Sequence, residues 1–230
     1  MSETKKDEAI NKQVPSRLEH LMYDFLYRFV GPHIPEKMTP NQVTLVGALC
    51  GLAGIVCSFL ARLNLLFLIG TVLGMMGHLV CDDLDGYVAR KRNMTSNAGA
   101  YFDLLTDILH ITFLIIGLAY TGVVKYEIAL WMVPVYALII FTSMNSILYL
   151  REFPFPRLGP IETHLFFQGV CIVAMVFGTG NRVMVWGFGL NITDIIFLVG
   201  MVPMYEEMIR LQISLFLRLK RSDRKETEET

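Results

Sequence analysis

Residues 82–107 read DDLDGYVARKRNMTSNAGAYFDLLTD and join two long apolar stretches of the chain. Four acidic side chains lie where these stretches end: Asp82, Asp85, Asp103 and Asp107. Charge is costly beside an apolar segment unless a partner compensates for it. On helices, steps of three and four residues place each pair of carboxylates on one face. If the polar link between the pairs reverses the chain, the two acidic faces meet and can bind one or two divalent cations.

The chain as a whole has the composition of a membrane protein. Of its 230 residues, 53% are hydrophobic and only 18% are charged, which is too apolar for an ordinary soluble domain. The first 20 residues are polar and lack a signal-peptide pattern, so the chain is expected to enter the membrane through its own spans. A net charge of −1 leaves no basic face for nucleic acid. The four cysteines show no CxxC spacing and are expected to pack as small apolar residues.

The apolar pattern predicts an all-α integral membrane protein with six transmembrane helices. The expected spans are about 43–60, 65–81, a third that carries Asp103 and Asp107 and ends near 124, 128–150, 165–175 with polar flanks to 164–181, and a sixth after Asn191. Glycines 47, 51 and 54 give the first span a face for close helix packing. Polar residues 91–97 are expected to reverse the chain between the second and third spans.

An amphipathic helix is predicted before the first span. Ser16 and Glu19 have the spacing of a capping box, and apolar residues then recur at steps of three and four. The segment is too short and too charged to span, so we expect it to lie in the membrane interface; packing on a soluble partner is the alternative. The chain thus divides into a polar N-terminus with this helix (1–40), a six-helix membrane domain (41–219) and a charged tail (220–230).

Basic residues predict the orientation in the membrane. When both termini are placed in the cytoplasm, all of the 20 Lys and Arg residues except Arg62, Lys125 and Arg182 fall on the cytoplasmic side. This bias matches the positive-inside rule. It also places the acidic cluster at the cytoplasmic ends of its helices, where nucleotides are found.

Eight residues of the opening stretch form the string D-x2-D-G-x2-A-R-x8-G-x3-D-x3-D, namely Asp82, Asp85, Gly86, Ala89, Arg90, Gly99, Asp103 and Asp107. This string resembles the signature of the CDP-alcohol phosphatidyltransferase family at every fixed position. The resemblance implies an enzyme dependent on Mg²⁺ or Mn²⁺ that moves a substituted phosphate group from a CDP-linked donor to a hydroxyl group and releases CMP. It implies that Asp82, Asp85 and Asp103 hold the metal, and that Asp107 shares a second metal and is the candidate base that deprotonates the acceptor. It also implies a homodimer.

Further residues are candidates for binding the CDP-linked donor. Gly86, Ala89 and Gly99 lack bulk, so a ribose, base or phosphate can approach the helix backbones, although tight helix packing also selects small residues. Arg90 can form forked hydrogen bonds to phosphate, or it can extend its charge to the membrane interface. Asn41 belongs to a Pro-Asn-x-x-Thr element that resembles one beside the metal and diphosphate in the family; helix capping explains it almost as well.

Other polar residues are candidates for binding the acceptor or its head group. The Gly-Pro-x-Glu string at 159–162, in the link 151–164, resembles an element of ethanolamine and choline phosphotransferases, which would make Glu162 or His164 an acceptor-positioning residue. Glu206 and Arg210 are four residues apart on the predicted sixth span and either pair with each other or bind a charged head group.

Two residues near the acidic cluster receive simpler interpretations. His78 lies one turn before Asp82 and is either a metal ligand or, as we prefer, a hydrogen-bonded interior histidine. Asp83 falls at an unspecified position of the string and is expected to face solvent.

Two pairings of substrates fit this sequence, and both require a lipid. We slightly prefer CDP-ethanolamine or CDP-choline reacting with diacylglycerol, and the alternative is CDP-diacylglycerol reacting with glycerol phosphate, serine or inositol. A divalent-cation channel or transporter is the candidate from another class. It is disfavoured because the sequence has no internal repeat and no acidic group near the middle of a span.

Overall fold

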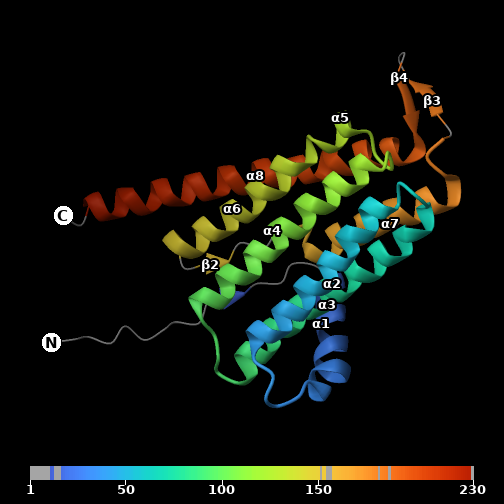
Figure 1. The fold of residues 1–230 in the computed structure, drawn as a ribbon. Coiled ribbons are helices and arrows are strands. Elements are labelled where there is room, and N and C mark those ends of the chain that lie inside the picture. The colour runs from blue at the N-terminus through green and yellow to red at the C-terminus, as the bar shows by residue number, and fades with distance from the viewer. Residues whose placement is uncertain are drawn as a thin grey trace.

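The computed structural model describes residues 11–12, 17–150, 152–153, 157–180, 182–185 and 188–228. Within them, five helical segments are long and apolar enough to cross a membrane. They are α2 (Pro40–Leu60), α3 (Leu68–Lys91) with its leading 3-10 turn (Leu65–Phe67), α4 (Asn97–Tyr120), α5 (Tyr126–Ala129) together with α6 (Met132–Leu150), and α7 (Pro160–Phe177). Figure 1 shows these helices running side by side as a bundle. The prediction of a helical integral membrane protein is therefore confirmed for these five segments.

Capping residues explain why α2 and α7 begin earlier than predicted. Thr39 and Gln42 form a reciprocal capping box around Pro40, so α2 starts before Val43. At α7, the Gly159 N–H donates to Glu162 Oε2 over 3.0 Å, and Pro160 occupies the first helical position. The link expected at 151–164 consequently ends at Gly159, and both Glu162 and His164 are helical.

The segment before α2 is helical but irregular. It consists of α1 (Arg17–Phe25), a π-helical turn η1 (Leu26–Val30) and a 3-10 turn η2 (Gly31–His33). Ser16 lies outside the described residues, so the predicted capping box there is not tested. This segment carries exposed apolar side chains along its length: Leu18, Leu21, Phe25 and Phe29. Such a face suits a membrane interface, and that location stays a prediction.

The C-terminal helix α8 (Ile192–Glu228) begins where the sixth span was predicted and extends well beyond it. It carries Asp194, Glu206, Glu207 and Arg210 within its first 19 residues and is not among the five apolar segments. The count of six spans therefore stays a prediction.

Short strands correct the all-α assignment. A hairpin of β3 (Arg182–Val185) and β4 (Phe188–Asn191) precedes α8, and β1 (Asn11–Lys12) pairs in parallel with β2 (Glu152–Phe153). No strand was predicted at residues 182–191, between the fifth and sixth expected spans, and the fold is mostly helical with these few short strands. In the hairpin their backbone groups satisfy one another, as polar backbone groups must.

Side chains of α2 divide by size between its two faces. Leu45, Leu49, Leu52 and Val56 are exposed, whereas the predicted glycine face is buried. A Cβ atom added at Gly54 would lie 3.2 Å from the Gly74 Cα atom of α3. The two helix backbones therefore touch, which is how small residues stabilise helix pairs in lipid. A larger apolar core unites α3, α4, α6, α7 and α8; its fully buried members include Met75, Leu114, Met132, Phe167 and Phe197.

A tight turn at residues 92–96 reverses the chain between α3 and α4, as predicted. Asn93 has a φ of 54°, a left-handed conformation that asparagine tolerates well. The Arg92 guanidinium donates to the Met38 carbonyl and, over 3.0 Å, to the Pro35 carbonyl, which fixes the turn against the start of α2. Figure 1 shows α1 and the beginning of α2 at the same end of the bundle as this turn. All four aspartates of the opening stretch thus approach that end.

Candidate metal and substrate site

Three of the four predicted carboxylates meet where α3 ends and α4 begins. One oxygen each of Asp82, Asp85 and Asp103 lies within 4.8 Å of the others. Asp85 is buried, and the other two are partly buried. Asp107, the fourth, is one turn further along α4, and its Oδ1 atom is 3.8 Å from His78 Nε2. The antiparallel meeting of two acidic helix faces thus yields a compact trio with a neighbouring fourth acid.

The first turns of α2 hold one member of this trio in place. The Thr44 hydroxyl donates to Asp85 Oδ2 over 2.5 Å, and both residues are buried. Thr44 also lies 3.2 Å from the Pro40 carbonyl, one turn earlier in the same helix. The threonine of the Pro-Asn-x-x-Thr element therefore orients a carboxylate and also contacts the backbone of its own helix.

The donor atoms fit a hard divalent cation. Asp103 Oδ1 is buried and has no hydrogen-bond partner among the described residues, although buried polar atoms normally have one. Three carboxylates at this spacing, with an oxygen left unsatisfied, provide the oxygen ligands that Mg²⁺ and Mn²⁺ prefer. Asp82, Asp85 and Asp103 are thus able to hold such an ion.

Small residues of the string lie where other polar groups approach closely. A Cβ atom at Gly99 would be 3.0 Å from Ser96 Oγ and 3.1 Å from Asn41 Oδ1. A Cβ atom at Gly86 would be 3.1 Å from the Arg90 guanidinium. Asn41 is exposed, and Ala89 is partly buried. Asn41 therefore faces the first turn of α4, one turn before Asp103 in that helix.

Arg90 makes a contact that neither sequence interpretation included. Its Nη2 atom donates to the Tyr27 hydroxyl over 2.9 Å, and that hydroxyl lies 3.4 Å from the Asp83 carbonyl. Burial raises the pKa of Tyr27, and this effect exceeds the lowering by Arg90. The guanidinium is otherwise exposed. Tyr27 therefore anchors Arg90 at the edge of the site.

Asp83 corrects one prediction, because it is 7% exposed rather than solvent-facing. The irregular segment η1 crosses this side of α3, where Leu26 packs with Leu84 and Val88. Tyr27, in the same segment, contacts the Asp83 carbonyl. The sequence could not reveal this cover, because it depends on where a separate helix docks.

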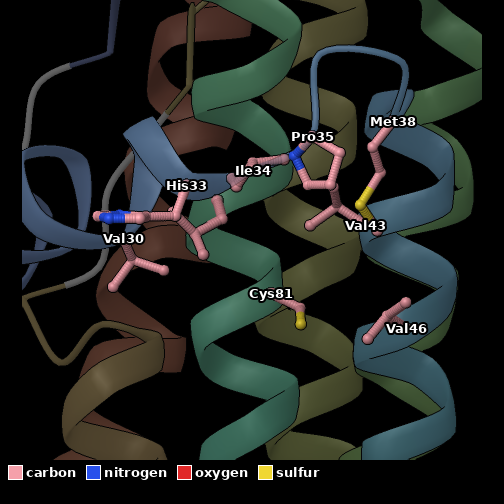
Figure 2. Close-up of a pocket in the computed structure, with 9 residues that line it drawn as sticks. Val30, His33, Ile34, Pro35, Met38, Val43, Val46 and Cys81 are labelled. Atoms are coloured by element: carbon pink, nitrogen blue, oxygen red, sulfur yellow. The ribbon is translucent and has the colours of Figure 1, made fainter.

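An apolar pocket lies between the N-terminal segment and the helices α2 and α3. Figure 2 shows side chains of the N-terminal segment facing α2 and α3 across it. The lining residues are Val30, His33, Ile34, Pro35, Met38, Val43, Val46, Cys81 and Leu84. Val43 and Leu84 lie on the same helical turns as Thr44 and Asp85, so the pocket is at the same level of α2 and α3 as that hydrogen-bonded pair.

The acceptor candidates lie on two helices: Glu162 and His164 on α7, and Glu206 and Arg210 on α8. Glu162 caps α7, as described above, whereas His164 is buried, with its ring centroid 5.9 Å from that of His78. On α8, Arg210 pairs with Glu207 instead of the predicted Glu206: Nε donates to Glu207 Oε2 over 2.8 Å, and Nη2 contacts Oε1. Glu206 points outward because a step of one residue rotates it away from the buried face.

Glu207 also binds the link before α7. The Arg157 N–H donates to its Oε1 atom over 2.7 Å. Glu207 is thus committed to internal contacts.

Histidines form the part of this region that the sequence did not reveal. His78 is buried, but the hydrogen bond expected for an interior histidine is missing: Nδ1 has no partner among the described residues. His110 was not singled out, although it lies three residues after Asp107 on α4, as His78 lies four before Asp82 on α3. That symmetry of histidine and aspartate across two helices was the available signal.

The fold and site together describe a helical integral membrane protein with a carboxylate cluster at one end of its bundle. Residues 37–202 match the sequence model of the CDP-alcohol phosphatidyltransferase family, which covers more than half of the chain, and the protein belongs to this family. It is accordingly a phosphotransferase of phospholipid synthesis that acts on a CDP-alcohol and an acceptor. A comparison with curated proteins found no match. Family membership sets aside the channel or transporter alternative.

Proposed function

We propose that this protein joins CDP-ethanolamine or CDP-choline to diacylglycerol, releases CMP and forms a phospholipid at the cytoplasmic face of its membrane. The observation that carries the metal-dependent part is the carboxylate trio within 4.8 Å, with Thr44 bonded to Asp85 and an unsatisfied Asp103 oxygen. The choice of donor rests on the resemblance of the Gly-Pro-x-Glu string at 159–162 to the ethanolamine and choline branch.

The reaction forms one phosphorus–oxygen bond and breaks another. A divalent cation held by Asp82, Asp85 and Asp103 would supply the charge that neutralises the donor's diphosphate. The acceptor hydroxyl attacks the phosphorus atom that bears the ethanolamine or choline, and the bond from this phosphorus to CMP breaks. Asp107 takes the hydroxyl proton. Thr44 holds Asp85 in its ligating orientation, and Arg90 contacts a donor phosphate from its anchor on Tyr27.

The apolar pocket supports a lipid substrate beside the trio. It opens among Val30, Ile34 and Val43, whose side chains offer no polar partner to a head group. An acyl chain placed there would bring its glycerol end toward Thr44 and Asp85. His164 is buried close to His78, whose Nε2 atom lies 3.8 Å from Asp107 Oδ1.

Purified protein supplied with each labelled CDP compound and measured for CMP release tests the proposal. We expect release from CDP-ethanolamine or CDP-choline that needs diacylglycerol and a divalent cation, and that Asp103→Asn abolishes. If CDP-diacylglycerol is the only donor from which CMP is released, the second substrate pairing is established instead. Release that persists in excess chelator would overturn the metal-dependent mechanism.

The orientation and the oligomeric state form part of the same proposal. We place both termini and the carboxylates in the cytoplasm because of the distribution of Lys and Arg. A cysteine introduced near Arg62 and treated with a membrane-impermeant reagent outside intact cells tests this orientation. We expect it to be labelled, and a lack of labelling would contradict the orientation. We expect a homodimer, and cross-linking in native membranes that yields monomer alone would contradict it.

A further inference from the structure

Three buried histidines from three helices meet one turn below the carboxylates. His78 on α3, His110 on α4 and His164 on α7 are each 3% exposed, and one nitrogen of each lies within 4.8 Å of the others. The ring centroids of His78 and His110 are 4.1 Å apart, and those of His110 and His164 are 5.7 Å apart. At a rise of 1.5 Å per residue, His78 lies about 6 Å further into the bundle than Asp82. This histidine cluster is therefore distinct from the carboxylate trio.

Hydrogen bonding leaves free lone pairs inside this cluster. His164 Nδ1 lies 2.8 Å from the Pro160 carbonyl, which can only accept, so Nδ1 carries the proton and Nε2 has a free lone pair. That Nε2 atom, His78 Nδ1 and both nitrogens of His110 are buried without hydrogen-bond partners among the described residues. Leaving such groups unsatisfied in an apolar interior destabilises the fold unless a ligand binds them. Each of the three rings thus has at least one unsatisfied nitrogen, and the rings bring one nitrogen each within 4.8 Å of the others, which indicates a missing ligand.

Imidazole nitrogen identifies the chemistry of that ligand. Neutral histidine is a preferred ligand of borderline transition metals such as Zn²⁺, whereas Mg²⁺ prefers oxygen. A histidine that donates its other N–H to a backbone carbonyl, as His164 does, has the usual arrangement of a metal ligand. The Asp107 carboxylate, 3.8 Å from His78 Nε2, provides negative charge beside a bound dication.

The spacing of the nitrogens permits this coordination. Nitrogens around tetrahedral Zn²⁺ lie about 3.3 Å apart, given Zn–N bonds of about 2.0 Å. Nitrogens already within 4.8 Å of one another need to close by no more than about 1.5 Å, which small rotations of the rings supply. Gly51 makes room for the rings, because a Cβ atom there would lie 2.7 Å from His110 Nδ1 and from His78 Cδ2.

We propose that His78, His110 and His164 form a second metal site that binds a Zn²⁺-type transition-metal ion, separate from the carboxylate trio. The site does not depend on the proposed reaction or its substrates. Its ion is held by neutral imidazoles inside the bundle, where it joins α3, α4 and α7 and stabilises their packing. Asp107 lies between this ion and the carboxylate trio.

The test is metal binding by the full chain in detergent, stripped with chelator and reloaded with Zn²⁺ or Co²⁺. We expect one tightly bound Zn²⁺ per chain that excess Mg²⁺ does not displace. With Co²⁺ we expect the intense visible absorption of a tetrahedral site. His110→Gln and His164→Gln should each weaken Zn²⁺ binding at least tenfold. Asp82→Asn should leave it unchanged. His33→Ala, which removes an exposed histidine outside the cluster, is the matched control.

Two outcomes would overturn the proposal. One is wild-type protein that retains no Zn²⁺ after reloading, and the other is a Co²⁺ spectrum of octahedral oxygen ligation that the histidine variants do not alter. The wild-type spectrum decides the question even if a histidine variant fails to fold. Because the readout is metal content and not CMP release, a failure here is distinct from a failure of the proposed function.

Discussion

The hydrogen bond from Thr44 to Asp85 gives the sharpest test of the carboxylate site. Replacing Thr44 with Val keeps the shape of the side chain and removes the hydroxyl that donates to Asp85 Oδ2 over 2.5 Å. A hydrogen bond to a charged group contributes about 1.5–3 kcal/mol. At 1.4 kcal/mol per factor of ten, its loss corresponds to a roughly ten- to hundredfold change, the range found when a partner of a metal ligand is removed.

Loss of the Thr44 hydroxyl should change the Mg²⁺ concentration that the enzyme needs. We expect Thr44→Val to raise the Mg²⁺ concentration for half-maximal CMP release roughly ten- to hundredfold, because Asp85 loses the group that orients it. Thr44→Ser retains a hydroxyl and should stay within about threefold of the parent protein. Thermal unfolding without metal separates this effect from general destabilisation.

Thr71 provides a matched control for the same chemical change. It is fully buried on α3, its hydroxyl has no hydrogen-bond partner among the described residues, and it lies 11 residues before Asp82. Thr71→Val should leave the Mg²⁺ requirement unchanged and should not destabilise the fold. If Thr44→Val also leaves the Mg²⁺ requirement unchanged while activity persists, the assignment of Asp85 as an oriented metal ligand is refuted.

Three further substitutions test other parts of the structure. Asp107→Asn should lower turnover at least a hundredfold while donor binding, measured by calorimetry, is retained; equal loss of both would count against its role as the base. Gly99→Ala should raise KM for the donor several-fold, because the new methyl group would lie 3.0–3.1 Å from two side-chain oxygens, and an unchanged KM would argue against close packing there. Arg210→Met leaves the buried Glu207 carboxylate without its cation and should destabilise the protein by about 2 kcal/mol in denaturant unfolding, less than the ~3–5 kcal/mol of a fully buried pair. Glu206→Gln, on the exposed neighbour, should change stability by less than about 0.5 kcal/mol.

The helices and the carboxylate trio were predictable because their determinants are local in sequence. Apolar runs of span length define α2 to α7, and steps of three and four residues define the acidic faces of α3 and α4. A short polar link between two such helices forces them to lie antiparallel. Asp82, Asp85 and Asp103 therefore come together as expected.

Features that depend on contacts between distant segments were not predictable. Asp83 is buried because η1 crosses α3, and the sequence around residue 83 does not predict that contact. Arg210 has acidic neighbours three and four residues before it, and only the packing of α8 selects Glu207. The histidine cluster requires that α7 pack on α3, which places His164 beside residues about 54 and 86 positions earlier in the chain.

The two candidate sites share the rigid helices that carry them. α3 contributes His78 to one and Asp82 and Asp85 to the other, while α4 contributes His110 and Asp103. A helix does not change its axial spacing between such residues without breaking hydrogen bonds, so a shift of α3 or α4 at one site reaches the other. Asp107 borders both sites, because it follows Asp103 by one turn of α4 and its Oδ1 atom is 3.8 Å from His78 Nε2. The shared helices and the contact between His78 and Asp107 therefore link the two proposed sites structurally.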